Sequence, residues 1–148
     1  MRFTRITITR VDVKPVNRPD INDELQQLGG ALGLINLRDK DKSRFRIFIA
    51  MLKALKRREL LSSDDLADQL GLTRATVIHH LDALMDAGIV EHMRGKYQLR
   101  VDTLVELVDV IQADIQKTFE ELKEVAANCD KGLGLDQPRK QPRNITPL

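Results

Sequence analysis

The sequence predicts a mainly α-helical protein with one small β-hairpin, an α+β arrangement in which helices dominate. Three observations support this fold class. Several segments place apolar residues at helical spacing behind polar residues that can cap a helix. One Arg94-Gly95 pair separates two short runs that are typical of strands. A long segment near the C-terminus repeats apolar residues at alternating steps of three and four, as in the seam of a coiled coil.

Residues 1–42 are expected to form an N-terminal strand arm followed by a short helix. Thr, Ile and Val dominate the first fourteen residues, but the apolar alternation changes phase between Ile8 and Val11, so we expect one bulged strand or two short strands. Residues 21–35 place Leu at helical spacing, with Asn22 as the expected N-cap. The glycines of this segment match neither phosphate-loop pattern and are interpreted as turn and packing positions.

Residues 43–100 predict three helices and the hairpin, in this order. Ser43 is expected to cap the first helix, which reaches about Glu59. Ser62 and the acidic residues after it predict the start of a short second helix, which Gly71 ends.

The third helix begins after Thr73 and reaches about Ala87. Residues 89–93 and 96–100 then flank the tight turn of the hairpin. The second and third helices are expected to pack through apolar side chains, while the glycine between them allows a sharp turn. This order of elements predicts a winged helix-turn-helix, with the third helix, about 73–87, in a DNA major groove and the hairpin, 89–100, on the backbone or in the minor groove.

About residues 43–100 also resemble a known family. The segment that carries the resemblance reads LADQLGLTRATVIHHLDALMDAGIVEHMRGKYQLR. It is similar to the winged helix-turn-helix of ArsR-type and related archaeal and bacterial transcription regulators. The resemblance implies a DNA-binding regulator with a long C-terminal helix that dimerises. It also suggests metal sensing, but Cys129 stands alone and the three histidines lack the spacing of a metal site, so neither a metal nor another cofactor is expected.

The residues expected to contact DNA come from three places. With Val77 at the centre of the buried face and about 100° per residue, the start of the third helix points outward. An alternative is that this outward face is only solvated and the domain binds protein. His80 lies nearer the buried side, where packing is favoured over a DNA contact. The candidate DNA contacts are Thr73, Arg74, Thr76 and His79 on the helix, Arg94 and Lys96 on the hairpin, and Arg57 and Arg58 at the end of the first helix.

Residues 101–130 predict a C-terminal dimerisation helix. Its seam is too apolar to be left in water, so we expect a homodimer, whose two recognition helices would meet half-sites about one helical turn apart. The alternative is that the seam packs on the helices of its own chain, and both can hold. The basic, proline-containing residues 131–148 are expected to be disordered. The residues expected at the dimer contact are Leu104, Val108, Ile111, Ile115, Leu122 and Val125.

The net charge of +2 hides an uneven distribution. Residues 1–60 hold fourteen Lys and Arg against seven Asp and Glu, residues 61–130 hold six against fourteen, and residues 131–148 hold four against one. DNA affinity depends on neutralising phosphates, so it must come from a few placed cations and not from bulk charge. The acidic middle therefore keeps open an alternative, a winged-helix module that scaffolds a protein complex, and a weaker third option of RNA binding.

Composition and motifs exclude several other classes. Hydrophobic residues make up 42% of the 148 residues, enough for one packed core. No long apolar run or secretory signal is present, so we expect a cytoplasmic protein without membrane contact. Aromatic residues are only 3%, which argues against a stacking platform for single strands. The sequence contains no motif that pairs a nucleophile with a base, so we do not expect an enzyme. A small-molecule effector, if there is one, stays unknown.

Overall fold

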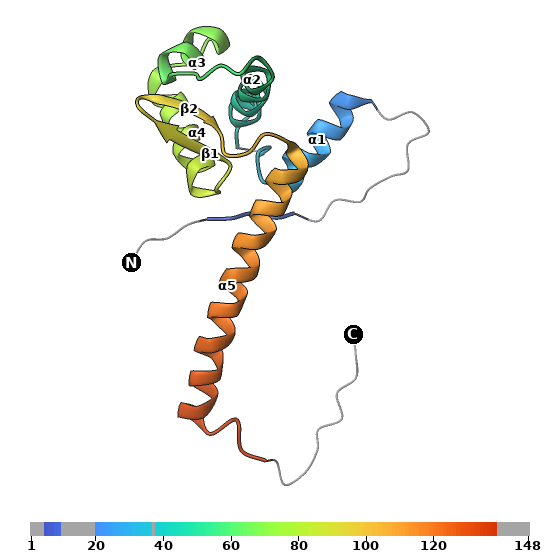
Figure 1. Ribbon diagram of the computed structural model, residues 1–148, viewed down its shortest axis with the longest axis vertical. Coiled ribbons are helices and arrows are strands. Elements are labelled where there is room, and N and C mark those ends of the chain that lie inside the picture. Colours follow the sequence, from blue (N-terminus) through green and yellow to red (C-terminus); the bar gives the residue numbers. More distant parts are fainter. Residues whose placement is uncertain (1–4, 10–19, 37, 139–148) are drawn as a thin grey trace. The chain divides into compact units, whose positions relative to one another are not determined.

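The computed structural model describes residues 5–9, 20–36 and 38–138 (Figure 1). The described residues form five helices and one two-stranded antiparallel hairpin, which confirms the predicted fold class of a mainly helical winged helix-turn-helix. The chain divides into two compact units, Met1–Ile111 and Gln112–Leu148. Among the described helices, none is long and apolar enough to cross a membrane.

The expected N-terminal strand is not formed over residues 5–9, the part of it that the structure describes; residues 1–4 and 10–14 lie outside the described residues. The backbone N–H of Thr9 donates to the carbonyl of Ala31 at 2.8 Å, at the end of a helix. Residues 5–9 therefore contact the end of a helix and not another strand. β-branched residues favour a strand only where a neighbouring strand is present, so the prediction of a strand is wrong for these residues.

Helix α1 (Ile21–Ala31) begins two residues earlier than a cap at Asn22 would imply. Its N-cap is Asp20, whose carboxylate accepts a hydrogen bond from the backbone N–H of Asn22 at 2.9 Å, so the prediction of Asn22 as the cap is wrong. A Cβ on the buried Gly29 would lie 2.7 Å from ring carbons of Phe45, so this glycine allows close packing, as predicted.

Helix α2 (Ser43–Arg57) also begins differently from the prediction. Ser43 is the buried first residue of the helix, and the cap position is held by Lys42, which has a left-handed backbone (φ 52°) and no capping side chain. Asp39 supplies the cap instead, because its carboxylate accepts a hydrogen bond from the backbone N–H of Arg44 at 3.0 Å. The helix ends at Arg57, two residues before the predicted end.

Helices α3 (Ser63–Leu70) and α4 (Arg74–Asp86) start and stop where their local residues predicted. Ser62 and Asp65 form a capping box at the start of α3, and the backbone N–H of Ser62 holds the pKa of the Asp65 carboxyl below its ordinary value. Gly71 ends α3 in the left-handed conformation (φ 65°), and the Thr73 side chain caps α4.

Strands β1 (Val90–Met93) and β2 (Lys96–Leu99) form the predicted hairpin. Arg94 and Gly95 both have positive φ (52° and 77°), as a two-residue hairpin turn of type I′ requires. The hairpin is fixed to the helices because Tyr97 and Leu61 exchange both of their backbone hydrogen bonds, at 2.7 and 3.2 Å. The wing therefore has a defined position on the domain.

Helix α5 (Leu104–Leu133) is the long C-terminal helix, and it continues past the predicted end. Its Leu107 and Ile111 are buried, but every residue from 116 to 138 is exposed. Residues 139–148 of the expected disordered tail lie outside the described residues. Helices α2, α3, α4 and α5 and the segments around residues 34 and 89 supply the largest side chains of the core in the first unit. The largest fully buried side chains are those of Leu34, Ile47, Phe48, Leu66, Val77, Leu81, Leu84, Ile89 and Leu107.

Candidate nucleic-acid interface

Helix α4 has one buried and one exposed side at its N-terminal half. Val77 and Leu81 are fully buried, whereas Arg74 and His79 are exposed. Packing of α4 against both α2 and α3 fixes this orientation. The predicted outward face is therefore present, and it offers side chains that can hydrogen-bond a base edge or a phosphate.

The two threonines at the start of α4 are joined to each other. The hydroxyl of Thr73 accepts a hydrogen bond from the backbone N–H of Thr76 at 3.2 Å and donates to the hydroxyl of Thr76 at 2.8 Å. Thr73 is thus occupied in capping the helix. Thr76 accepts in this pair, so its own hydroxyl proton is available to a phosphate or base acceptor.

Arg74, the first residue of α4, lies close to the start of α3. Its Nε lies 3.6 Å from a carboxylate oxygen of Asp64, and both side chains are exposed, at 68% and 73%. The guanidinium is therefore accessible to a ligand at the surface.

His80 is packed inside the domain, which confirms the interpretation that favoured packing over a DNA contact. The Nε–H of Arg44 donates to the Nδ1 of His80 at 3.2 Å, and the Nε2 of His80 lies 3.9 Å from a carboxylate oxygen of Asp39. Burial, followed by the charge of Arg44, lowers the pKa of His80 against the opposing effect of Asp39. Burial alone would raise the pKa of Asp39, but hydrogen bonds from the backbone of Arg44 and Ser43 hold it below its ordinary value.

Sequence reasoning missed this cluster because its members are far apart in the chain. Arg44 and His80 are separated by 36 residues, and Asp39 lies between two predicted helices, outside both of them. The cluster joins the loop before α2 to the middle of α4. It therefore helps to hold that helix in place.

The hairpin presents its candidate cations at its tip. Arg94 in the turn and Lys96 at the start of β2 are exposed. Behind them the rings of His92 and Tyr97 stack at 4.4 Å with an interplanar angle of 19°. This cross-strand pair was not predicted, and it stiffens the hairpin that carries the two cations.

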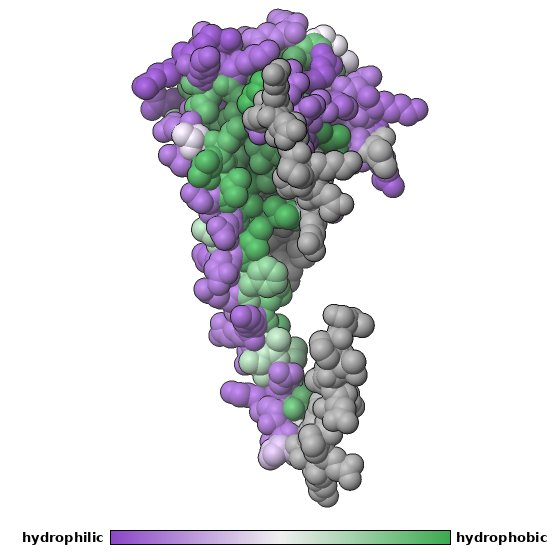
Figure 2. Space-filling model, turned by 90° about the vertical axis from the view of Figure 1, so that its right-hand side faces the viewer, coloured by the Kyte–Doolittle hydropathy of each residue, from purple (hydrophilic) through white to green (hydrophobic). Residues whose placement is uncertain are grey.

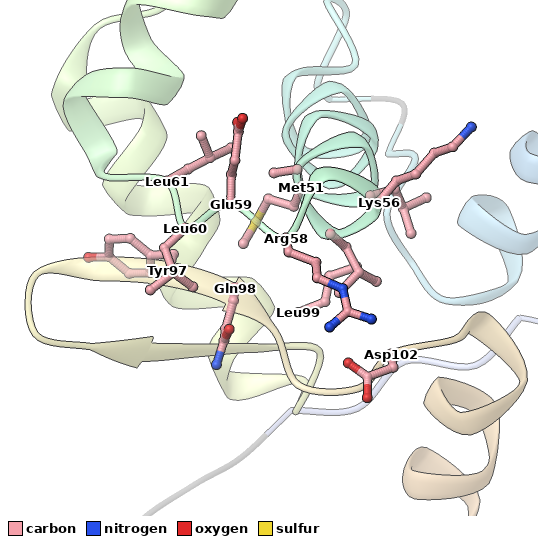
Figure 3. A pocket seen from close by; sticks show the side chains of 13 residues that line it. Met51, Lys56, Arg58, Glu59, Leu60, Leu61, Tyr97, Gln98, Leu99 and Asp102 are labelled. Carbon is pink, nitrogen blue, oxygen red and sulfur yellow. The ribbon is translucent and has the colours of Figure 1, made fainter.

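Arg57 and Arg58, at the end of α2, have different surroundings. Arg57 forms an ion pair with Glu59 at 3.2 Å. Arg58 has a left-handed backbone (φ 58°) and lines a cavity of about 590 Å³ beside Tyr97 and Gln98 of β2, where its guanidinium points toward Asp102 (Figure 3). The structure therefore places Arg58 next to the wing, whereas Arg57 is paired with Glu59.

Clusters of three or more possible metal ligands (His, Cys, Asp or Glu) do not occur among the residues that the structure describes. Asp82 and Asp86, further along α4, are exposed. They would repel phosphate, which confines a favourable DNA surface to the N-terminal half of the helix.

A capped short helix, a glycine turn, a second helix with an exposed N-terminal half and an adjoining hairpin define a winged helix-turn-helix protein. The comparison with protein families agrees. Residues 49–92, from the middle of α2 into β1, match the family described as bacterial regulatory protein, arsR family. This part of the chain is similar to the helix-turn-helix of ArsR-type regulators, as the sequence resemblance predicted, and the match points to a DNA-binding transcription regulator rather than to an enzyme. No curated protein matches the chain.

Proposed function

We propose that this protein is a homodimeric transcription regulator that reads a specific DNA sequence. The N-terminal half of α4 enters the major groove, where Arg74, Thr76 and His79 reach base edges or phosphates. The observation that supports this most strongly is the exposure of Arg74 and His79, with Thr76 partly exposed beside them, on the same helix that buries Val77.

The wing and the end of α2 supply the phosphate contacts in this proposal. Arg94 and Lys96 lie at the exposed tip of the hairpin, within reach of the backbone or minor groove beside α4. Arg58 borders the same hairpin, and Arg57 adds charge at the end of α2. Residues 43–100 are thus assigned as the DNA-binding domain.

Dimerisation is assigned to α5, within residues 101–130. Phe119, Leu122 and Val125 are 56–58% exposed and lie on a helix whose second half has no buried residue. Figure 2 shows apolar surface along this helix. Such an apolar stripe is costly to leave in water and favours a second copy as its cover. Ile111 is only 3% exposed within a single chain, so the dimer contact is expected to rest mainly on Val108, Ile115, Phe119, Leu122 and Val125.

The proposal is tested by selecting duplexes that bind the purified full-length chain and then titrating them at several salt concentrations. The affinity is expected to fall steeply between about 50 and 200 mM salt, because cations on the protein release counterions from the phosphates. Absence of duplex binding at low salt would overturn the proposal.

A protein-scaffolding module remains the second candidate. It is favoured by the excess of acidic residues in 61–130, fourteen against six basic, and by the exposed Asp82 and Asp86 on α4. Such a module would bind no duplex at low salt and would form a stable complex with a different protein. Structured RNA in a parallel titration separates the RNA-binding option from both.

A further inference from the structure

Two neighbouring carboxylates at the start of α3 have different partners. Asp65 belongs to the capping box, where its side chain accepts a hydrogen bond from the backbone N–H of Ser62 at 2.9 Å. Asp64 instead faces the recognition helix, 3.6 Å from the Nε of Arg74. The capping box accounts for one carboxylate, and the second contacts a side chain that the proposed function places on DNA.

The atom that faces Asp64 matters for what Arg74 can bind. A guanidinium has five N–H donors, and the one on Nε points away from the outer edge formed by Nη1 and Nη2. The major-groove edge of guanine offers two acceptors, O6 and N7, which two such donors can engage together. Arg74 can therefore bind a guanine through its outer edge while its Nε stays beside Asp64.

A phosphate would meet different electrostatics at the same place. It is an anion, so its approach to Arg74 brings it near the negative charge of Asp64. A guanine is neutral and does not experience this repulsion. The pair Asp64–Arg74 should thus accept a base edge more readily than a backbone phosphate.

We propose that Asp64 is a specificity-determining residue that positions Arg74 for a guanine and disfavours its contact with phosphate. This rests on the proposed function of α4 in the major groove. In the free protein the pair is exposed and adds little to stability. Its effect arises in the complex, where DNA displaces water and strengthens the attraction between carboxylate and guanidinium.

The test compares Asp64→Asn with Asp68→Asn in the full-length chain. Both variants remove one negative charge from an exposed position of α3. The readouts are the affinity for the selected duplex, the affinity for a duplex of the same length with its guanines replaced, and the thermal unfolding midpoint. Asp64→Asn is expected to lower the ratio of the two affinities about fivefold or more, since a bidentate arginine–guanine contact accounts for about tenfold discrimination or more. Asp68→Asn should leave the ratio unchanged, and Asp64→Glu should largely restore it.

Combination with Arg74→Ala tests whether Asp64 acts through that arginine. In the Arg74→Ala background, Asp64→Asn should no longer change the affinity ratio. The inference would be overturned if Asp64→Asn left the affinity ratio unchanged, or if Asp64→Asn changed the ratio equally with and without Arg74→Ala. In either case, duplex binding by the wild-type chain would still support the proposed function. If the wild-type chain binds no duplex, both fail. A purely structural role would instead lower the unfolding midpoint of Asp64→Asn and leave the ratio intact.

Discussion

The two halves of α5 carry similar apolar side chains but place them in opposite surroundings. Before Gln112 the helix belongs to the first unit and buries Leu107 and Ile111; after it, Phe119 and Leu122 are exposed. The apolar pattern along the sequence does not mark this change. A periodic apolar stripe therefore shows that a helix needs a partner surface, but only the structure shows which part of the stripe the chain covers itself.

The largest expected effect concerns the buried half. Leu107→Ala should lower the free energy of unfolding by about 2–5 kcal/mol, because it removes a fully buried side chain and leaves a cavity. Urea unfolding measures this. Val105→Ala, at a position that is 72% exposed, is the control and should change it by less than about 0.5 kcal/mol. Equal effects of the two would show that Leu107 is not part of the core.

The exposed half should respond in association and not in folding. Leu122→Asp is expected to weaken the dimer about a hundredfold or more, because a symmetric interface would bury the new carboxylate twice. Light scattering across a dilution series measures this, and circular dichroism checks that the helix content is kept. Lys117→Gln makes the same change in charge elsewhere on α5 and should leave the dimer intact. If the Leu122→Asp protein stayed dimeric, α5 would not form the dimer interface.

The proposed DNA surface of the first unit should be independent of that interface. Arg74→Ala is expected to cost about 1–3 kcal/mol in discrimination against a changed base, without altering the dimer. Lys96→Ala should instead weaken all duplexes alike and reduce the salt slope by about 1. Anisotropy titrations on selected and altered duplexes measure both. If Arg74→Ala weakened all sequences equally, Arg74 would be a phosphate contact.

The smallest expected effect is a pH dependence that belongs to the first unit. The pKa of His80 is lowered by burial and by Arg44, so the unfolded chain binds its proton more readily than the folded one. The contribution of neutral His80 to the stability of the folded state is complete above the ordinary pKa of 6.5 and is lost as the pH falls below that value. Urea unfolding at about pH 7.5 and about pH 5.5 should show this loss in the wild type and in His92→Gln, but to a smaller extent in His80→Gln. An equal loss in all three would assign it to other groups.

Local signals allowed much of the helix-turn-helix to be predicted. The capping box at Ser62, the glycine at position 71 and the Arg94-Gly95 turn act within a few residues, so the sequence contains their whole cause. The candidate residues of α4 follow from the same local periodicity, and the structure exposes Thr73, Arg74 and His79 as expected.

Contacts between distant segments explain what could not be predicted. Asp39 caps α2 from outside the helix, so Ser43 was chosen wrongly. The partly buried cluster around His80 joins residues 36 positions apart. In α5 the chain buries Leu107, which lies outside the predicted seam, together with Ile111, which lies in it, because the face that packs on the core is set by distant segments and not by the spacing within the helix.

The central claim, a dimer that reads DNA, is tested most directly by the composition of the complex with a selected duplex. Measuring the mass of that complex by light scattering while titrating salt gives both stoichiometry and electrostatics. We expect two chains on each duplex, two half-sites about one helical turn apart, and an affinity that falls linearly with salt on logarithmic axes. One chain on each duplex, or no complex at low salt, would contradict the claim.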